Sequence, residues 1–173
     1  MSGIRVILGT MEIGRRVTPT VATEMVSTFL SRAEYREIDT ASMYADTATE
    51  SILGGIEQWK ENGKMATKIN PWGPNVGAKP TKSHGFSYKP DALRQQVENS
   101  LDRLNVDNVD ILYLHAPDHN TSPVETLEEL AKLKQDGKFS ELGLSNYSSW
   151  LTCEMVNVAK QYGFPIPTVY QGH

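Results

Sequence analysis

The stretch that decides the fold reads Val-Asp-Ile-Leu-Tyr-Leu-His, residues 109–115. It is almost continuously apolar before the final histidine, which is typical of a strand buried on both faces of a parallel sheet. Other strand-like runs lie along the chain at residues 4–8, 36–40, 64–69, 139–144 and 168–170. The sequence therefore predicts about six strands, most of them followed by a polar residue.

Helical patterns separate these runs. A helix is expected over about residues 21–32, and another after a capping box formed by Thr47 and Glu50. Helices are also expected to begin at three residues of the second half: Pro90, Pro123 and Ser149. The apolar residues expected on the buried face of the second helix are Ile52, Leu53 and Ile56.

Strict alternation of strands and helices predicts right-handed βαβ units and a parallel sheet. A doubly wound sheet usually carries a glycine-rich phosphate loop after its first strand, and residues 9–14, Gly-Thr-Met-Glu-Ile-Gly, do not match that fingerprint. A barrel instead places polar residues at the carboxyl ends of many strands. We therefore predict an α/β fold of the (β/α)8 TIM-barrel type, with about the first six β/α units in a single domain over residues 1–173.

Composition narrows the class of protein. Hydrophobic residues make up 39% and charged residues 22% of the chain, a normal globular balance. The net charge of -4 argues against a nucleic-acid partner. The single cysteine, Cys153, fits a reducing compartment, and no apolar run is long enough to cross a membrane. We expect a cytoplasmic protein without a membrane partner, in which Cys153 is inert.

Polar residues follow one strand after another, and in a barrel such strand ends converge on one mouth. They are Asp39, Lys68, His115, Ser145, Asn146 and Gln171, with Tyr44 in the loop after Asp39. A nearby ammonium lowers the pKa of a phenol, so Lys68 would make Tyr44 a better proton donor. Asp39 would keep Lys68 charged and in place, and His115 would orient a carbonyl oxygen. The set predicts general acid catalysis.

Several segments carry a family resemblance. They are residues 39–44 (Asp-Thr-Ala-Ser-Met-Tyr), 66–68 (Ala-Thr-Lys), 114–118 (Leu-His-Ala-Pro-Asp) and 143–147 (Gly-Leu-Ser-Asn-Tyr). In this order they resemble the aldo-keto reductase family, and residues 9–11, 70–72, 115–119 and 169–172 are similar to its aflatoxin-aldehyde and succinic-semialdehyde reductase branch.

The resemblance implies reduction of a small carbonyl compound with NADPH. It implies a catalytic tetrad of Asp39, Tyr44, Lys68 and His115, with Tyr44 as proton donor. Ser145, Asn146 and Gln171 would hold the nicotinamide, with Asp39 and Met11 also beside the cofactor. Trp72, with Tyr44 and His115, would face the substrate. No metal site is expected, and we interpret the remaining histidines as surface residues: His84, His119 and His173.

A complete barrel of this type has eight strands and about 250 residues, whereas this chain reaches only about the sixth strand. We therefore expect weak or absent activity from this chain alone, because the open sheet leaves a strand edge unpaired. Two non-catalytic alternatives stay open. One is a truncated isoform that forms homo-oligomers or associates with a full-length relative. The other is a regulatory binding subunit similar to the potassium-channel β subunits.

Overall fold

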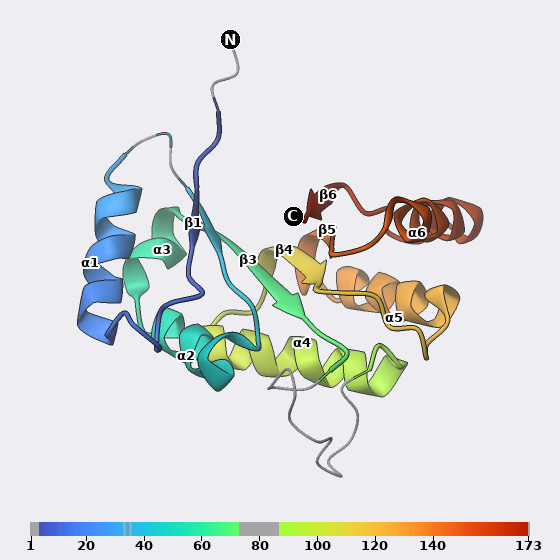
Figure 1. Cartoon of the computed structure of the whole chain (residues 1–173), viewed down its shortest axis with the longest axis horizontal. Coiled ribbons are helices and arrows are strands. Elements are labelled where there is room, and N and C mark those ends of the chain that lie inside the picture. Colours follow the sequence, from blue (N-terminus) through green and yellow to red (C-terminus); the bar gives the residue numbers. More distant parts are fainter. Residues whose placement is uncertain (1–3, 33, 35, 73–86, 173) are drawn as a thin grey trace.

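The computed structural model describes residues 4–32, 34, 36–72 and 87–172. Its strands form one parallel sheet in the order β1-β2-β3-β4-β5-β6 (Figure 1). They are β1 (Ile7–Gly9), β2 (Glu37–Asp39), β3 (Lys64–Ile69), β4 (Val109–Leu114), β5 (Phe139–Ser145) and β6 (Val169–Gln171). Every predicted strand is present, and the spatial order equals the chain order, as in a barrel.

The helices lie in an arc on the outside of the curled sheet (Figure 1). They are α1 (Pro19–Leu30), α2 (Ala48–Gly54), α3 (Glu57–Asn62), α4 (Pro90–Leu104), α5 (Pro123–Gln135) and α6 (Ser149–Tyr162), with a short 3₁₀ turn η1 (Tyr44–Thr47). A curled parallel sheet with helices on its outer side is an incomplete (β/α) barrel, so the predicted fold class is confirmed.

Local signals explain most helix ends. Proline occupies the start of α1, α4 and α5, where its missing N–H group costs no hydrogen bond. Ser122 and Glu125 form a capping box at α5. The predicted cap of α6 was displaced by one residue, because Ser148 and not Ser149 accepts the amide of Leu151 (3.3 Å).

The capping box predicted at Thr47 and Glu50 is wrong. Thr47 has a left-handed backbone (φ 76°) and makes no side-chain cap. The Glu50 carboxylate points inward instead and accepts hydrogen bonds from Thr67 (2.6 Å) and Arg103 (2.7 Å). A charged tertiary partner outweighs a local amide, because hydrogen bonds between charged groups are the stronger ones.

The single helix expected after Thr47 is in fact two, α2 and α3, with Ile56 at the start of the second. Gly54 ends α2 against α4, where a Cβ atom would lie 2.1 Å from the carbonyl oxygen of Arg103. The close approach of two backbones therefore sets this break, and Ile52, Leu53 and Ile56 still pack in or against the core.

The core lies between the sheet and its helices. Leu112 and Leu114 of β4 join it together with residues of each neighbouring helix, whereas Tyr113 between them lies outside that cluster. Alternate side chains of a strand point to opposite faces, so Tyr113 and His115 face the barrel interior. Asp110 and Ile111 are only partly buried, so burial of β4 on both faces is incomplete.

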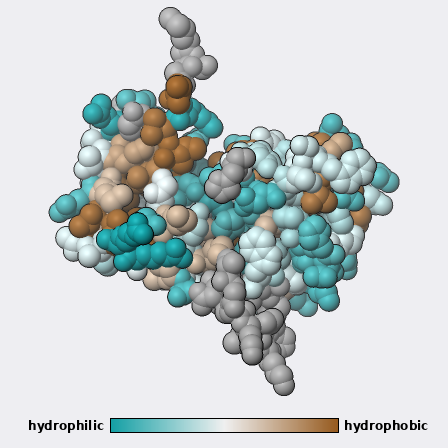
Figure 2. All heavy atoms as spheres, viewed as in Figure 1, coloured by the Kyte–Doolittle hydropathy of each residue, from teal (hydrophilic) through white to brown (hydrophobic). Residues whose placement is uncertain are grey.

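The two edge strands of the described sheet are β1 and β6. Near β1 the side chains of Ile4, Val6 and Ile7 are exposed, and Figure 2 shows hydrophobic side chains gathered on that side of the molecule. Tyr170 of β6 is also exposed. Among the described residues, no helix combines the length and apolarity needed to span a bilayer.

Candidate active site

Backbone hydrogen bonds past the ends of the strands gather the polar residues at one rim. The amide of Thr40 donates to Ala66, and that of His115 donates to Ile69. Further along the rim, the amide of Asn146 donates to Gln171. Parallel pairing thus continues into the turns, so residues far apart in the sequence become neighbours.

Lys68 and Asp39 form the buried centre of this rim. The Lys68 ammonium donates to Oδ1 of Asp39 (2.5 Å) and to the carbonyl oxygen of Thr40 (2.8 Å). The lysine side chain is 1% exposed. Burial lowers the pKa of Lys68, and the charge of Asp39 opposes that effect. Asp39 therefore favours the charged lysine, as predicted from the sequence.

Tyr44 and His115 complete the group. The Lys68 Nζ atom lies 5.4 Å from the centre of the Tyr44 ring. The rings of Tyr44 and His115 meet edge to face, with centres 6.1 Å apart. The structure therefore brings together all four side chains of the predicted tetrad.

The pKa values of Tyr44 and His115 are both shifted away from neutral pH. The pKa of Tyr44 is raised to about 12 by burial and by the charge of Asp39, while Arg15 acts in the opposite direction. The predicted lowering of the Tyr44 pKa by Lys68 is therefore wrong for this structure. Burial and the nearby Lys68 charge lower the pKa of His115 to about 4. At neutral pH the phenol keeps its proton and the imidazole is uncharged.

Tyr44 stands at the start of a strained turn. The three residues after it, Ala45, Asp46 and Thr47, all have left-handed backbones. Such conformations are costly for residues with a Cβ atom and persist only where the surroundings enforce them. Just beyond the turn, Thr49 of α2 donates from its buried hydroxyl to the carbonyl oxygen of Ile13 (2.7 Å). Three such residues in a row could not be predicted from the sequence, because none is glycine and only Asp46 is of a type that adopts this region readily.

A cleft of about 420 Å³ opens beside Tyr44 and His115. It is lined by Met11, Arg15, Met43, Tyr44, His115, Ser145, Asn146, Gln171 and Gly172. All the residues predicted to face the nicotinamide therefore lie at one cleft, except the more deeply buried Asp39. Arg15 and Met43 are lining residues that the sequence analysis missed, because they lie in loops away from the strand ends.

The amide group of Asn146 is fixed at the edge of the cleft. It donates to the carbonyl oxygen of His115 (2.9 Å) and to the hydroxyl of Ser145 (3.1 Å). Its backbone is left-handed (φ 59°), which asparagine adopts more readily than most residues. The side-chain oxygen of Asn146 therefore has a defined orientation relative to the cleft.

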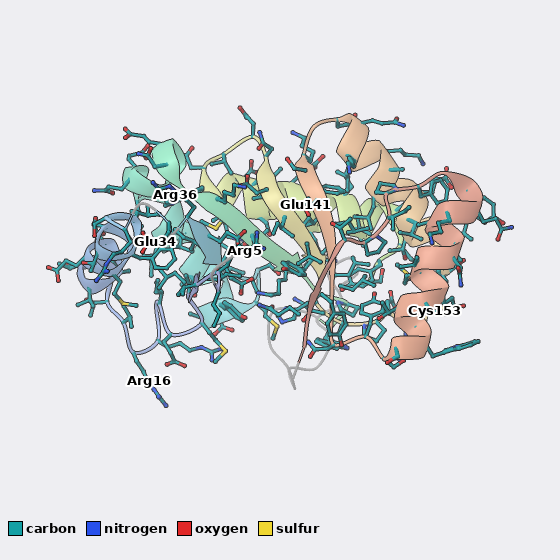
Figure 3. The ribbon with its side chains drawn as sticks, turned by 90° about the horizontal axis from the view of Figure 1, so that it is seen from above. Arg5, Arg16, Glu34, Arg36, Glu141 and Cys153 are labelled. Atoms are coloured by element: carbon teal, nitrogen blue, oxygen red, sulfur yellow. The ribbon has the colours of Figure 1, made fainter. Side chains whose placement is uncertain are left out.

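Trp72 is not brought to this cleft. It is half-exposed, and its backbone amide donates to Oδ1 of Asn70 (2.9 Å). His84 and His173 lie outside the described residues, and His119 lines a different pocket beside Asp118. Cys153 is exposed on α6, at the opposite side of the molecule from Arg16 (Figure 3).

Residues 5–172 match the model of the aldo/keto reductase family. The chain belongs to this family. The match covers every strand of the sheet and each member of the Asp39–Tyr44–Lys68–His115 group.

Several curated relatives are similar to nearly the whole chain. The rat aflatoxin B1 aldehyde reductase member 2 is 48% identical over 170 residues, which are 96% of this chain and 43% of the relative. Human aflatoxin B1 aldehyde reductase member 4 is 44% identical, with 96% of this chain and 48% of the relative covered. This chain thus spans less than half the length of these proteins.

The structure is also similar to a solved one. A thermostable aldo-keto reductase crystallised with the inhibitor epalrestat superposes with a TM-score of 0.78 at 25% sequence identity. The superposition covers 98% of this chain and 58% of that chain. The strands and helices described above therefore correspond to part of an aldo-keto reductase barrel.

Proposed function

We propose that this chain supplies the proton-transfer half of an NADPH-dependent reduction of aldehydes or ketones to alcohols. The single observation that carries the proposal is the buried Lys68–Asp39 ion pair directly beside the rings of Tyr44 and His115. Perturbed ionisable groups that meet in a cleft are typical of active sites.

Tyr44 is the proposed acid. Its raised pKa keeps the phenol protonated at neutral pH, so a proton is available when a carbonyl becomes an alkoxide. Transfer of that proton leaves a phenolate. The Arg15 charge, which opposes the rise of the Tyr44 pKa, favours this anion, and the Lys68 ammonium lies 5.4 Å from the ring centre. His115 is uncharged at that pH and can hold a carbonyl oxygen by hydrogen bonding without competing for the proton.

The cleft beside Tyr44 suits a nicotinamide. Its walls offer hydroxyl and amide side chains at Ser145, Asn146 and Gln171, which can pair with both the donor and the acceptor of a carboxamide. Met11 would contact the cofactor from β1, and Asp39 would lie beneath it. NADPH, when bound, supplies the hydride. The choice of NADPH over NADH rests on the family resemblance.

The substrate that we propose is a small aldehyde, as the names of the similar reductases suggest. The resemblance places Trp72 beside the substrate, although Trp72 is not among the residues that line the cleft. The lone exposed Cys153 fits a reducing compartment, and we propose a cytoplasmic location.

Tyr44→Phe tests the assignment. It removes the acidic proton and keeps the ring, so we expect at least a hundredfold loss of aldehyde-dependent NADPH oxidation, the lower end of general acid catalysis. Tyr162→Phe on the outer face of α6 is the matched control and should keep the rate. Full turnover by the Tyr44 variant would show that Tyr44 is not the proton donor.

A second candidate is a non-catalytic subunit that associates with a full-length relative or with itself. The exposed apolar side chains of Ile4, Val6 and Ile7 beside edge strand β1 favour it, because unpaired edges recruit other chains. This role predicts an oligomer by size-exclusion chromatography and no change in protein fluorescence on titration with NADPH.

A further inference from the structure

Tyr113 lies next to Lys68 in the sheet, although nothing in the proposed reaction requires it. The two residues are direct partners across β3 and β4, and Tyr113 is in turn the partner of Gly143 on β5. Side chains at the same level of neighbouring strands point to the same face. Lys68 and Tyr113 therefore share one layer of the barrel interior, at a level where Gly143 has no side chain.

The tyrosine ring contacts the ammonium. Lys68 Nζ lies 5.6 Å from the centre of the Tyr113 ring, and 5.4 Å from that of Tyr44. Both distances fall within the range of cation–π attraction, about 6 Å. The ammonium thus has two oxygen acceptors, from Asp39 and Thr40, and two aromatic neighbours.

Gly143 makes room for this arrangement. A Cβ atom at position 143 would lie 2.3 Å from Cδ1 of Tyr113, so any larger residue would displace the ring. Tyr113 itself is 4% exposed, which excludes water from its contact with the lysine. The Tyr113 ring is therefore closely packed between Gly143 and Lys68.

The hydroxyl of Tyr113 contributes no charge to the layer. Burial and the charges of Asp39, Glu37 and Glu141 raise the pKa of Tyr113 to about 12, against a smaller opposite effect of Arg5. Arg5 also pairs with Glu37 (3.3 Å), and Figure 3 labels Arg5 and Glu141 among the side chains of the strand region. The phenol is neutral at working pH, so its ring is the part that acts on Lys68.

We propose that Tyr113 is a positioning residue for Lys68: its ring, seated over Gly143, holds the ammonium between Tyr44 and Asp39 and favours its charged form. The groups that face Lys68 are then Asp39 from β2, Tyr44 from η1, Tyr113 from β4, and His115 directly after β4. The proposal rests on the proposed function only for the consequence in catalysis, because the charge state of Lys68 is measurable without any reaction.

A series of substitutions at position 113 distinguishes the effect of the aromatic ring on Lys68 from that of the hydroxyl group. Tyr113→Phe keeps the ring and should leave the ammonium titration of Lys68, followed by NMR of the ¹⁵N-labelled side chain, close to that of the parent protein. Replacement of that phenylalanine by its 4-fluoro and 3,4,5-trifluoro analogues weakens the ring's attraction for cations at nearly constant shape. The titration midpoint should then fall stepwise, by about one pH unit in total, which is the scale of a desolvated cation–π contact.

Catalysis supplies an independent measurement on the full chain, or on the complex if association is needed for turnover. The fluorinated variants should lower kcat progressively with little change in KM for the aldehyde, while Tyr113→Phe keeps the rate. A shifted Lys68 titration with an unchanged kcat would support the positioning role and contradict the proposed part of Lys68 in catalysis. An unchanged midpoint across the fluorinated series, or a Phe variant as impaired as the trifluoro one, would overturn the positioning role.

Discussion

The centre of the site and the cleft beside it are built differently. Asp39, Lys68 and His115 extend from β2, β3 and β4, each of which has a neighbour on both sides. Met11 and Gln171 extend from the ends of β1 and β6, which have one neighbour each within the described sheet. The proton-transfer groups are therefore held by sheet pairing and burial, whereas the proposed cofactor groups lie on exposed edges. Three predictions test how firmly the centre and its surroundings are held.

The largest effect is expected from Lys68→Met. Methionine has a similar length but leaves the Asp39 carboxylate buried without its partner. Losing one member of a buried ion pair destabilises a protein by about 3–5 kcal/mol. Urea denaturation should show this loss, whereas Lys132→Met, which removes a surface ion pair with Glu128, should leave the midpoint unchanged. Equal midpoints for the two variants would mean that the centre is no more tightly built than the surface.

The pH dependence of stability tests the same centre. The pKa of folded His115 is about 4, below its ordinary value near 6.5, so the folded state disfavours the charged imidazole. The neutral form contributes stability above about pH 6.5, and this contribution is lost as the pH falls toward 4. We expect a loss of about 2 kcal/mol across this window, after allowance for partial exposure of the ring.

His115→Gln is the control, since glutamine does not titrate. Its free energy of unfolding should change less between pH 6.5 and 4 than that of the parent chain, when both are measured by urea denaturation. Parallel curves for the two proteins would show that the imidazole is not desolvated in the folded state.

A smaller effect is expected from Glu50→Gln, which probes the buried hydrogen-bond network that joins α2 to β3 and α4. The amide can still accept from the Thr67 hydroxyl, but it loses the charge that faces Arg103. Because Arg103 can reach water, we expect a loss of about 1–2 kcal/mol and not the full cost of a buried unpaired ion. Glu57→Gln on the surface of α3 should have little effect by thermal denaturation. A Glu50 variant as stable as the Glu57 variant would show that this network does not contribute to stability.

Much of the fold was accessible from the sequence because its signals are local. Every expected strand is present, and the 64–69 and 109–114 segments match β3 and β4 in full. Where contacts between segments far apart in the sequence decided the outcome, the prediction failed. The capping box at Thr47 lost Glu50 to Thr67 and Arg103, and the helix expected there is broken at Gly54 by contact with α4.

The sequence by itself determined which residues stand at the carboxyl ends of the strands, because apolar runs and the residues that end them are written in order along the chain. Tertiary structure alone decided how those residues act on one another. Burial raises the pKa of Tyr44 and lowers that of His115, strand register places Tyr113 beside Lys68, and a buried hydrogen bond joins Thr49 to Ile13. Each depends on the distance between groups that are far apart in sequence, and a linear pattern does not contain that distance.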